Sequence, residues 1–428
     1  MAVDVLIIGS GGREHALAWK LKQSPRVGKL YIAPGNGGTR LLGENVPIGV
    51  MEFEKLAQFA AEKKIGLTVV GPDDAFVGGI VDVFTAHGLR IWGPTRGAAQ
   101  IEGSKAFAKA LMQEAKIPTA KFSVFKSAAL ALAHVRTTGV PIVIKASGLA
   151  LGKGVYVCEA MAEAEHAIKE IMIERVHKDA GNEVVIEEYL DGPEISIHAL
   201  SDGTSHMIFP PSEDHKQALD GDKGSNTGGM GTIAPVSWVN LEMMASIESS
   251  VVIPTFETLK KRGIEFKGLL FPGLKMTSGA KVLEYNARFG DPECQVYMRL
   301  LKSDLLDLLE ACVDGNLDTA RKRAEWRKGY AANVVIASGG YPEAYQKGFP
   351  ITGIEEAEKV EGVVVFHAGT KCNEMSSHCI TNGGRVLSVS AIGDTLKTAL
   401  DRAYEAVGKI QFEGKYFRRD IGAKALGR

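Results

Sequence analysis

The sequence of 428 residues has few cysteines and no long apolar run. We expect neither a secretory leader nor a membrane span, since the N-terminus carries Asp4, lacks a basic region and is apolar over only a few residues. The cysteines are odd in number and lack the spacing of metal ligands, which indicates reduced thiols in a cytoplasmic protein. They are Cys158, Cys294, Cys312, Cys372 and Cys379.

An excess of charge of one sign is also missing. Lysine and arginine number 50 against 51 aspartate and glutamate residues, a formal net charge of -1. With balanced charges the protein has no overall electrostatic attraction to nucleic acid or to an acidic membrane, so we expect neither partner. Any affinity for phosphate must be local. The length exceeds that of a single core, so several domains are expected.

The first hundred residues alternate apolar strands with helices. This order predicts a doubly wound parallel sheet, whose ligands bind beyond the carboxyl ends of the strands. Those ends lead into loops rich in glycine and proline. The expected strands are 3–8, 29–33, 67–70 and 89–92, with helices at 53–64 and 77–86.

The turn after the first strand contains Gly9, Gly11 and Gly12 and opens a helix. Free N–H groups at a helix start attract anions, so the turn predicts a site for a phosphorylated ligand. It resembles a dinucleotide fingerprint, but Glu14 replaces the third glycine, which weakens an NAD interpretation. A purely structural tight turn is the alternative.

The next segment combines lysines with a glycine loop. Lys145 ends a buried strand, where an ammonium group needs an anion. In the following loop Lys153 lies among glycines, and such a loop can cover phosphates with its N–H groups. It is not a P-loop, because Gly154 follows where serine or threonine is required, and a hairpin with a solvated lysine is the alternative. Strands are expected at 122–125, 140–146, 155–158, 184–190 and 194–200, with helices from 105 and at 128–135.

Acidic and polar residues follow. Glu187 and Glu188 lie near the end of an apolar strand, where they suit the amino group of a base and ribose hydroxyls, or form a solvated edge. The polar run 212–231 is too long for a simple connection and predicts a functional loop. A helix at 241–262, a hairpin of strands 268–276 and 281–286, and a helix at 300–312 are expected next.

The stretch 281–295 concentrates ionisable groups. Glu284 and Asn286 are two apart on a strand and share one face, where their oxygen atoms suit Mg²⁺. Arg288, Asp291 and Glu293 follow in a glycine- and proline-containing turn. The alternative is a solvated strand end with mutually paired charges.

From about residue 326 the chain forms a small α+β unit. Strands are expected at 331–337, 363–367 and 385–389 and a helix at 395–407. Its glycine-rich segments, 338–342 and 381–384, are interpreted as turn geometry rather than chemistry.

The order of Lys145, the Lys153 loop, the Glu187–Glu188 strand end and the Glu284-x-Asn286 strand resembles the ATP-grasp ligases. Together with residues 9–15 and 228–231, the run Arg288-Phe-Gly-Asp-Pro-Glu293 resembles the phosphoribosylamine–glycine ligase family along essentially the whole chain. The resemblance implies an N-terminal α/β substrate-binding domain (1–102), an ATP-grasp domain (103–325) with a mobile central lid (about 121–190), and a C-terminal α+β domain (326–428).

The resemblance implies an ADP-forming ligase of purine biosynthesis. ATP and glycine would form glycyl phosphate, which the amine of 5-phosphoribosylamine attacks to give glycinamide ribonucleotide. Glu284 and Asn286 would hold Mg²⁺ or Mn²⁺, and Arg288, Lys153 and Asp291 would be catalytic. The implied ATP-binding residues are Lys105, Lys145, Gly148, Gly152, Lys153, Gly154, Glu187, Glu188 and Glu194.

The implied acceptor side includes the N-terminal glycine loops. Departures from the family pattern at residues 71–76, Leu151 and Ser225 concern the acceptor pocket and the glycine loop rather than the lysines and the metal pair. We expect a monomer, with a homodimer as the alternative. The substrate-binding residues are Gly9, Gly11, Gly12, Gly35, Asn36, Gly71, Pro72, Asp214, His215, Lys216, Gly229, Arg288, Pro292 and Glu293.

Two other functions compete with this one. An ATP-grasp ligase with another amine or carboxylate substrate would use the same lysines and metal pair. A nucleotide sensor or an NAD-binding module would use the first glycine turn and would bind without turnover.

Overall fold

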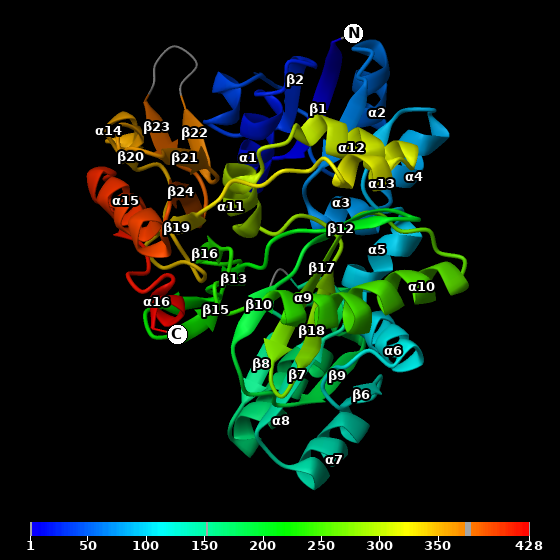
Figure 1. Cartoon of the computed structure of the whole chain (residues 1–428). Helices are drawn as coiled ribbons and strands as arrows, with labels where there is room; N and C mark the ends of the chain where they lie inside the picture. Colours follow the sequence, from blue (N-terminus) through cyan, green and yellow to red (C-terminus); the bar gives the residue numbers. More distant parts are fainter. Residues whose placement is uncertain (1, 151–152, 373–377, 428) are drawn as a thin grey trace.

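The computed structural model describes residues 2–150, 153–372 and 378–427. Its N-terminal part, drawn in blue in Figure 1, contains a parallel sheet in the order β3-β2-β1-β4-β5. The predicted parallel sheet is therefore confirmed. The strands are β1 (Val3–Gly9), β2 (Val27–Pro34), β3 (Glu44–Asn45), β4 (Leu67–Val70) and β5 (Ile91–Trp92), and the helices between and after them are α1 (Gly12–Leu21), α2 (Phe53–Glu62), α3 (Asp73–Gly78), α4 (Ile80–Ala86) and α5 (Arg96–Gly103).

The strand order reverses between β1 and β4, and this position locates the ligand-binding edge of the sheet. Residues of β4 are buried throughout, as expected for a strand covered on both faces. One predicted helix, 77–86, is wrong: Gly79 has a φ of +95° and separates α3 from α4. The left-handed conformation, which favours glycine, ends the first helix.

Two antiparallel sheets form the centre of the chain. One has the order β6-β9-β7-β8, and in the other β17 lies between β10 and β11 and also pairs with β18. The first contains β6 (Phe122–Phe125), β7 (Ile142–Ala146), β8 (Val155–Cys158) and β9 (Val184–Glu188), with α7 (Ala128–Thr138) and α8 (Met161–Ile168). The second contains β10 (Glu194–Ser196), β11 (Ala199–Asp202), β12 (His206–Ile208), β17 (Lys267–Met276) and β18 (Ala280–Asn286), with α6 (Lys105–Ala115), α9 (Leu241–Ile247) and α10 (Ile253–Lys261) nearby.

The C-terminal sheet has the order β13-β16-β19-β24-β21, with β25 beside β19. Two of its strands come from the central segment, one inside the polar run 212–231 and one that begins at its last residue, whereas the sequence predicted a unit that starts only at about residue 326. The strands are β13 (Glu213–Asp214), β16 (Gly231–Ala234), β19 (Tyr330–Ser338), β21 (Val363–His367), β24 (Arg385–Gly393) and β25 (Lys415–Tyr416), and the helices are α14 (Ile354–Glu358), α15 (Leu396–Lys409) and α16 (Ala423–Leu426). Smaller pairings involve β14 (Gln217–Leu219) with β15 (Lys223–Asn226), and β20 (Pro350–Ile351), β22 (Thr370–Cys372) and β23 (Cys379–Thr381).

Helix α11 (Glu293–Leu300) lies between the N-terminal and C-terminal sheets, and every residue in it is buried. It packs against α1 on one side and against β19 and β24 on the other. The predicted helix at 300–312 is wrong, because α11 ends at Leu300 and α12 (Leu305–Asp314) starts after a turn, before α13 (Leu317–Arg321). Charged and polar residues of α11, Glu293, Gln295 and Arg299, are buried, so its buried surface does not follow from a pattern of apolar residues.

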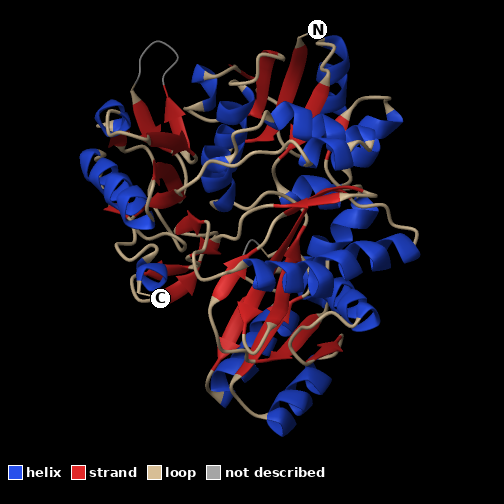
Figure 2. Cartoon of the chain, in the orientation of Figure 1, coloured by secondary structure: helices blue, strands red, loops and turns tan. Residues whose placement is uncertain are grey.

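Two further predictions need correction. The strand expected at 194–200 is two strands, interrupted at Ile197 and His198, where the His198 ring stacks on Phe271 and accepts the Gly290 N–H. The helix expected at 241–262 contains a π-helical turn at Glu248–Val252 between α9 and α10. Figure 2 shows helices and strands mixed along the whole described chain.

The cysteines are not all reduced. Cys372 and Cys379 are joined by a disulfide, whereas Cys158, Cys294 and Cys312 are free and buried. The prediction of thiols alone is therefore wrong, because the paired strands β22 and β23 place two cysteines opposite each other, which spacing in sequence did not indicate. Among the described residues, no helix is both long and apolar enough to cross a membrane.

Candidate active site

A cleft of about 820 Å³ lies where the N-terminal, central and C-terminal parts of the chain meet. Its lining joins residues that are far apart in sequence, from Arg13 to Arg385. Most of the predicted ATP and metal residues belong to this lining, together with four of the fourteen predicted substrate-binding residues and Asp291. They are Lys105, Lys145, Lys153, Gly154, Glu187, Glu188, Glu194, Asp214, Lys216, Glu284, Asn286, Arg288, Asp291 and Glu293.

Lys145 is held at the floor of the cleft by Glu187. The pairing of β7 with β9 brings the two side chains together, with Lys145 Nζ 3.0 Å from Glu187 Oε2. Lys109 Nζ lies 3.1 Å from the other oxygen, and burial lowers the pKa of Lys109 to about 8 although Glu187 opposes this. Lys145 also donates to the Leu283 carbonyl, at 3.0 Å. A buried carboxylate thus orders two ammonium groups.

The glycine loop lies above these lysines. Lys105 Nζ donates to the carbonyl of Gly148 at 3.4 Å, and burial lowers the pKa of Lys105. Lys153 Nζ donates to the carbonyl of Pro342 at 3.0 Å, which ties the loop to the C-terminal part. Gly154 lines the cleft, whereas Gly152 lies outside the described residues.

Glu284 is surrounded by cations. Burial raises its pKa, but Lys216, Lys145, Lys105 and Arg288 outweigh that effect and hold the pKa of Glu284 at about 2. Lys216 Nζ lies 3.5 Å from a Glu284 oxygen and 3.4 Å from a Glu194 oxygen. The carboxylate is therefore ionised at neutral pH.

Asn286 and Arg288 form a second group with Glu102. Arg288 donates to Asn286 Oδ1 at 3.0 Å and pairs with Glu102 Oε1 at 2.8 Å. The other Glu102 oxygen accepts the Ala287 N–H at 2.6 Å. Burial raises the pKa of Glu102 to about 7, although Arg288 lowers it. The contact with Glu102 orients the guanidinium of Arg288 in the cleft.

Asp214 and Glu293 are neighbouring carboxyl groups, of which Glu293 is buried and Asp214 half-buried. Burial and the neighbouring carboxylate raise the pKa of Asp214 well above its ordinary value, and burial raises the pKa of Glu293. Gly229 packs behind them, because a β-carbon there would overlap Pro292 and crowd Asp214. His215 does not reach the cleft: its Nδ1 lies 3.2 Å from the Gly231 carbonyl and its Nε2 accepts the Gly422 N–H.

Asp291 connects the site to both outer parts of the chain. Arg385 pairs with its carboxylate at 3.1 Å and donates to its carbonyl at 2.5 Å. Gln295 donates to Asp291 Oδ1 at 2.8 Å. Burial raises the pKa of Asp291, but Arg385 and Arg13 outweigh it and keep the pKa below its ordinary value.

The predicted N-terminal glycine residues converge beside this group. Gly35 N donates to Gly9 O, Gly71 N donates to Ile8 O, and Asn36 Nδ2 donates to Ser10 O at 2.9 Å. Gly12 lies against Gln295, and Pro72 precedes α3. The structure therefore brings Gly9, Gly11, Gly12, Gly35, Asn36, Gly71 and Pro72 to one edge of the parallel sheet.

One N–H group of this turn is already occupied. Gly11 donates to Glu14 Oε2 at 2.6 Å, and Arg13 Nε lies 2.5 Å from Glu14 Oε1. Glu14 replaces the third glycine of a dinucleotide fingerprint. Its own carboxylate thus occupies the Gly11 N–H, to which a ligand phosphate could otherwise bind. β-Carbons at Gly9 or Gly71 would overlap this carboxylate.

Comparison with known proteins identifies the family. The models of phosphoribosylglycinamide synthetase match the chain as the N domain (3–102), the ATP-grasp (A) domain (103–294) and the C domain (331–424). The chain belongs to the phosphoribosylglycinamide synthetase family.

Curated and solved members of this family are similar to the chain along nearly its whole length. The phosphoribosylamine–glycine ligase of Rhodopirellula baltica is 46% identical over 430 residues, covering 99% of this chain and 98% of that protein. The crystal structure of phosphoribosylamine–glycine ligase from Thermotoga maritima is 34% identical with a TM-score of 0.84, covering 98% of this chain and 100% of that one. The predictions of family, fold class and ligase chemistry are confirmed.

A more distant structure shares the fold alone. The biotin carboxylase domain of Hydrogenobacter thermophilus 2-oxoglutarate carboxylase is 17% identical with a TM-score of 0.75, covering 97% of this chain and 92% of that one. The overall fold therefore does not by itself distinguish this chain from a biotin carboxylase domain.

Several residues that line the cleft were not predicted from the sequence of this synthetase. Lys109 and Glu102 lie on helices that opened no recognised motif, and Arg13 adjoins the glycine turn. Arg385 and Tyr341 lie in or beside the C-terminal glycine segments interpreted as turns, so that interpretation is incomplete. Gly384 packs on the Tyr341 ring, and the turn delivers Arg385 to the cleft. The sequence contained one indication of this role, since Arg385 directly follows the paired glycines Gly383 and Gly384.

Proposed function

We propose that this chain joins glycine to 5-phosphoribosylamine with ATP, through glycyl phosphate, giving glycinamide ribonucleotide, ADP and phosphate in purine biosynthesis. One observation carries the proposal: Lys105 and Lys145 share a cleft with the Arg288–Glu293 turn, beside the glycine loops of the parallel sheet. Phosphoryl transfer requires positioning and charge neutralisation rather than a side-chain nucleophile, and these residues supply both.

On the ATP side, Lys105, Lys145 and Lys153 face the phosphates, and the backbone of Gly148 and Gly154 covers them; Gly152, the third predicted glycine, lies outside the described residues. Glu188 and Glu194 face the base and the ribose. Glu187 acts through Lys109 and Lys145, because both of its oxygens are within ion-pair distance of these ammonium groups. It is therefore a positioning residue for phosphate binding.

Glu284 and Asn286 fit a divalent cation that arrives with a nucleotide. Glu284 is ionised, and the Asn286 oxygen retains a lone pair beside its bond to Arg288. Lys216, Lys145 and Lys105 would repel a bare cation, whereas ATP phosphates would offset that repulsion. Mg²⁺ or Mn²⁺ held there would neutralise phosphate charge. In support, the biotin carboxylase neighbour was solved with magnesium ADP.

Calorimetric titration tests this metal site without turnover. Mg²⁺ should tighten ADP binding in the native chain, and Glu284→Gln should remove most of that gain while Glu257→Gln, an exposed change, preserves it. An equal gain in both variants would reject Glu284 as a ligand.

On the acceptor side, Arg288 holds the glycine carboxylate or acyl phosphate through its forked donors. Asp291 fixes Arg13 and Arg385 around the reacting groups, and Asp214, Lys216 and Glu293 face the amine. These side chains pack against Gly229 and Pro292, and the neighbouring His215 holds the backbone of Gly231. Gly9, Gly11, Gly12, Gly35, Asn36, Gly71 and Pro72 form the receiving edge for the phosphoribosyl group.

An ADP-release assay with each substrate omitted in turn tests the reaction. We expect release to require ATP, Mg²⁺, glycine and phosphoribosylamine together. Release without glycine would indicate another ATP-grasp substrate, and binding without release would indicate a sensor. We also propose the domain division 1–102, 103–325 and 326–428 with a lid at about 121–190, and a cytoplasmic monomer, which limited proteolysis, cell fractionation and light scattering can test.

A further inference from the structure

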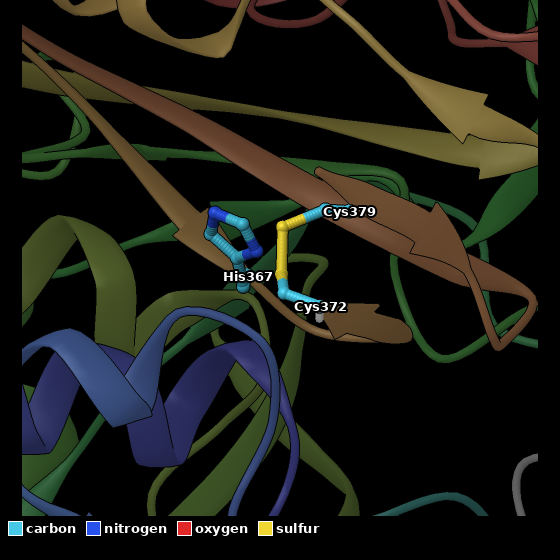
Figure 3. Close-up of side chains that lie close together, drawn as sticks. All are labelled: His367, Cys372 and Cys379. Atoms are coloured by element: carbon cyan, nitrogen blue, oxygen red, sulfur yellow. A yellow bond between two sulfur atoms is a disulfide. The ribbon is translucent and has the colours of Figure 1, made fainter. Parts of the chain in front are cut away.

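The Cys372–Cys379 disulfide lies beside the glycine loop of β2. Its cysteines face each other across β22 and β23, and Figure 3 shows a ring nitrogen of His367 turned toward the two sulfur atoms. His367 Nδ1 lies 3.0 Å from Thr370 Oγ1, on the same hairpin. The sulfur atoms are bonded to each other, so in this state the cluster does not offer two thiolates to a metal ion.

The hairpin contacts the glycine loop directly. Gly37 N donates to the Thr370 carbonyl at 3.2 Å, and Asn36 Nδ2 donates to the His367 carbonyl at 2.8 Å. A β-carbon at Gly37 would overlap Cys372 Sγ, so the sulfur lies against the backbone of the loop. The same Asn36 amide reaches Ser10 in the first glycine turn. These contacts connect the sulfur to the backbone of the loop and, through Asn36, to the first glycine turn.

The other cysteines are poorly suited to redox chemistry. Burial raises the pKa of Cys158 to about 11 and that of Cys312 to about 12, and it raises the pKa of Cys294 well above its ordinary value. Thiols with raised pKa values form little thiolate at neutral pH. Cys372 is only half-buried, so a small reductant can reach this pair. An isolated disulfide beside a functional loop is more typical of a redox-responsive site than of a structural framework.

We propose that Cys372 and Cys379 form a reversible redox site that controls the Gly35–Gly38 loop and, through it, the affinity for the phosphorylated acceptor. The effect on affinity rests on the proposed function; the coupling to the loop does not. A dithiol reduces the bond by two-electron exchange, in which each sulfur gains one hydrogen and the dithiol becomes a disulfide. A low-molecular-weight disulfide reverses the reaction.

The expected direction follows from sulfur geometry. Two unbonded thiols must separate to van der Waals distance, and Cys372 Sγ has the Gly37 backbone on one side. Reduction should displace the Gly35–Gly38 loop and weaken the hydrogen bond from the Gly37 N–H to the Thr370 carbonyl. The affinity for the phosphorylated acceptor should then fall. ATP binding, which uses Lys105 and Lys145, should not respond.

Thiol counting and hydrogen exchange test the coupling without turnover. Denatured protein should show three thiols after treatment with glutathione disulfide and five after dithiothreitol, from the five cysteines of the chain. Peptides covering residues 34–41 should exchange about tenfold faster in the reduced protein, while β4 stays unchanged. Five thiols in both samples, or equal exchange in the loop, would overturn the proposal.

Kinetics then test the consequence. Reduction should raise the KM for phosphoribosylamine by about threefold or more, with little change in the KM for ATP. The double variant Cys372→Ser with Cys379→Ser should resemble the reduced protein and ignore dithiothreitol, whereas Cys158→Ala should respond like the native chain. A double variant that keeps the oxidised KM would contradict the proposal. An inactive protein with the expected exchange difference would instead count against the proposed reaction.

Discussion

The ammonium group of Lys145 lies 3.0 Å from the carboxylate of Glu187, and both side chains are almost fully buried. Glu187→Gln would remove the carboxylate that pairs directly with Lys145 and Lys109 and leave only the more distant charge of Glu284. Breaking a buried ion pair from one side costs about 3–5 kcal/mol, so the free energy of unfolding in urea should fall by about that amount. The KM for ATP should rise, because Lys145 is no longer positioned.

Glu257→Gln is the matched control, since Glu257 is exposed on α10. It should leave both the urea midpoint and the KM unchanged. A Glu187→Gln protein with native stability and native KM would show that the pair contributes nothing to either.

Glu102 gives the site a pH dependence near neutrality. Its pKa in the folded chain is raised to about 7 from an ordinary 4.5, so the native state binds this proton more tightly than the unfolded state. The stability contribution is therefore full below about pH 4.5 and is lost as the pH rises to about 7. In the native chain, kcat/KM for glycine should rise through about pH 7, as ionised Glu102 orients Arg288.

Glu102→Gln should flatten both profiles in this range. Thermal unfolding and initial rates between pH 5 and about 8.5 measure them. An inflection near pH 7 that persists in the variant would assign the titration to another group.

Gly71 leaves room for Glu14 at the switch point of the parallel sheet. A β-carbon at Gly71 would overlap the Glu14 carboxylate and approach Arg13. Gly71→Ala should displace Glu14 from the Gly11 N–H and raise the KM for phosphoribosylamine by about tenfold, with a smaller effect on ATP. Initial-rate kinetics measure both constants.

Gly97→Ala provides the control for this substitution. Gly97 is exposed on α5, and no atom lies within 4 Å of its added β-carbon. Alanine favours helix there, so this variant should keep native kinetics and gain slight stability. Equal KM values in the two variants would exclude a role for the Gly71–Glu14 contact.

Arg385 links the C-terminal sheet to the cleft. It donates to the carbonyls of Gly228 at 2.6 Å and of Asp291 at 2.5 Å, in addition to its ion pair with Asp291. Lysine keeps the charge but loses this fork of donors, so Arg385→Lys should reduce kcat/KM by about tenfold or more. Arg419→Lys, at an exposed position, should have no effect. Steady-state kinetics with saturating ATP distinguish the two.

Local patterns in the sequence predicted many of the residues that line the cleft on its proposed ATP side. A lysine at the end of a buried strand, glycines around Lys153, and Glu284 two residues before Asn286 are short-range features, because strand geometry alone places such side chains at one edge or on one face. The parallel sheet followed from alternating periodicities in the same way. These predictions needed no knowledge of how the sheets pack.

The tertiary structure alone decided the rest. Glu102 reaches Arg288 because α5 packs against β18, and Arg385 reaches Asp291 from the end of β24 in the C-terminal sheet. The Cys372–Cys379 pair exists because two short strands align, and strand register is not encoded in spacing. The sequence by itself determined which chemical groups the chain carries and the local geometry of some; packing between distant segments decided which of them meet.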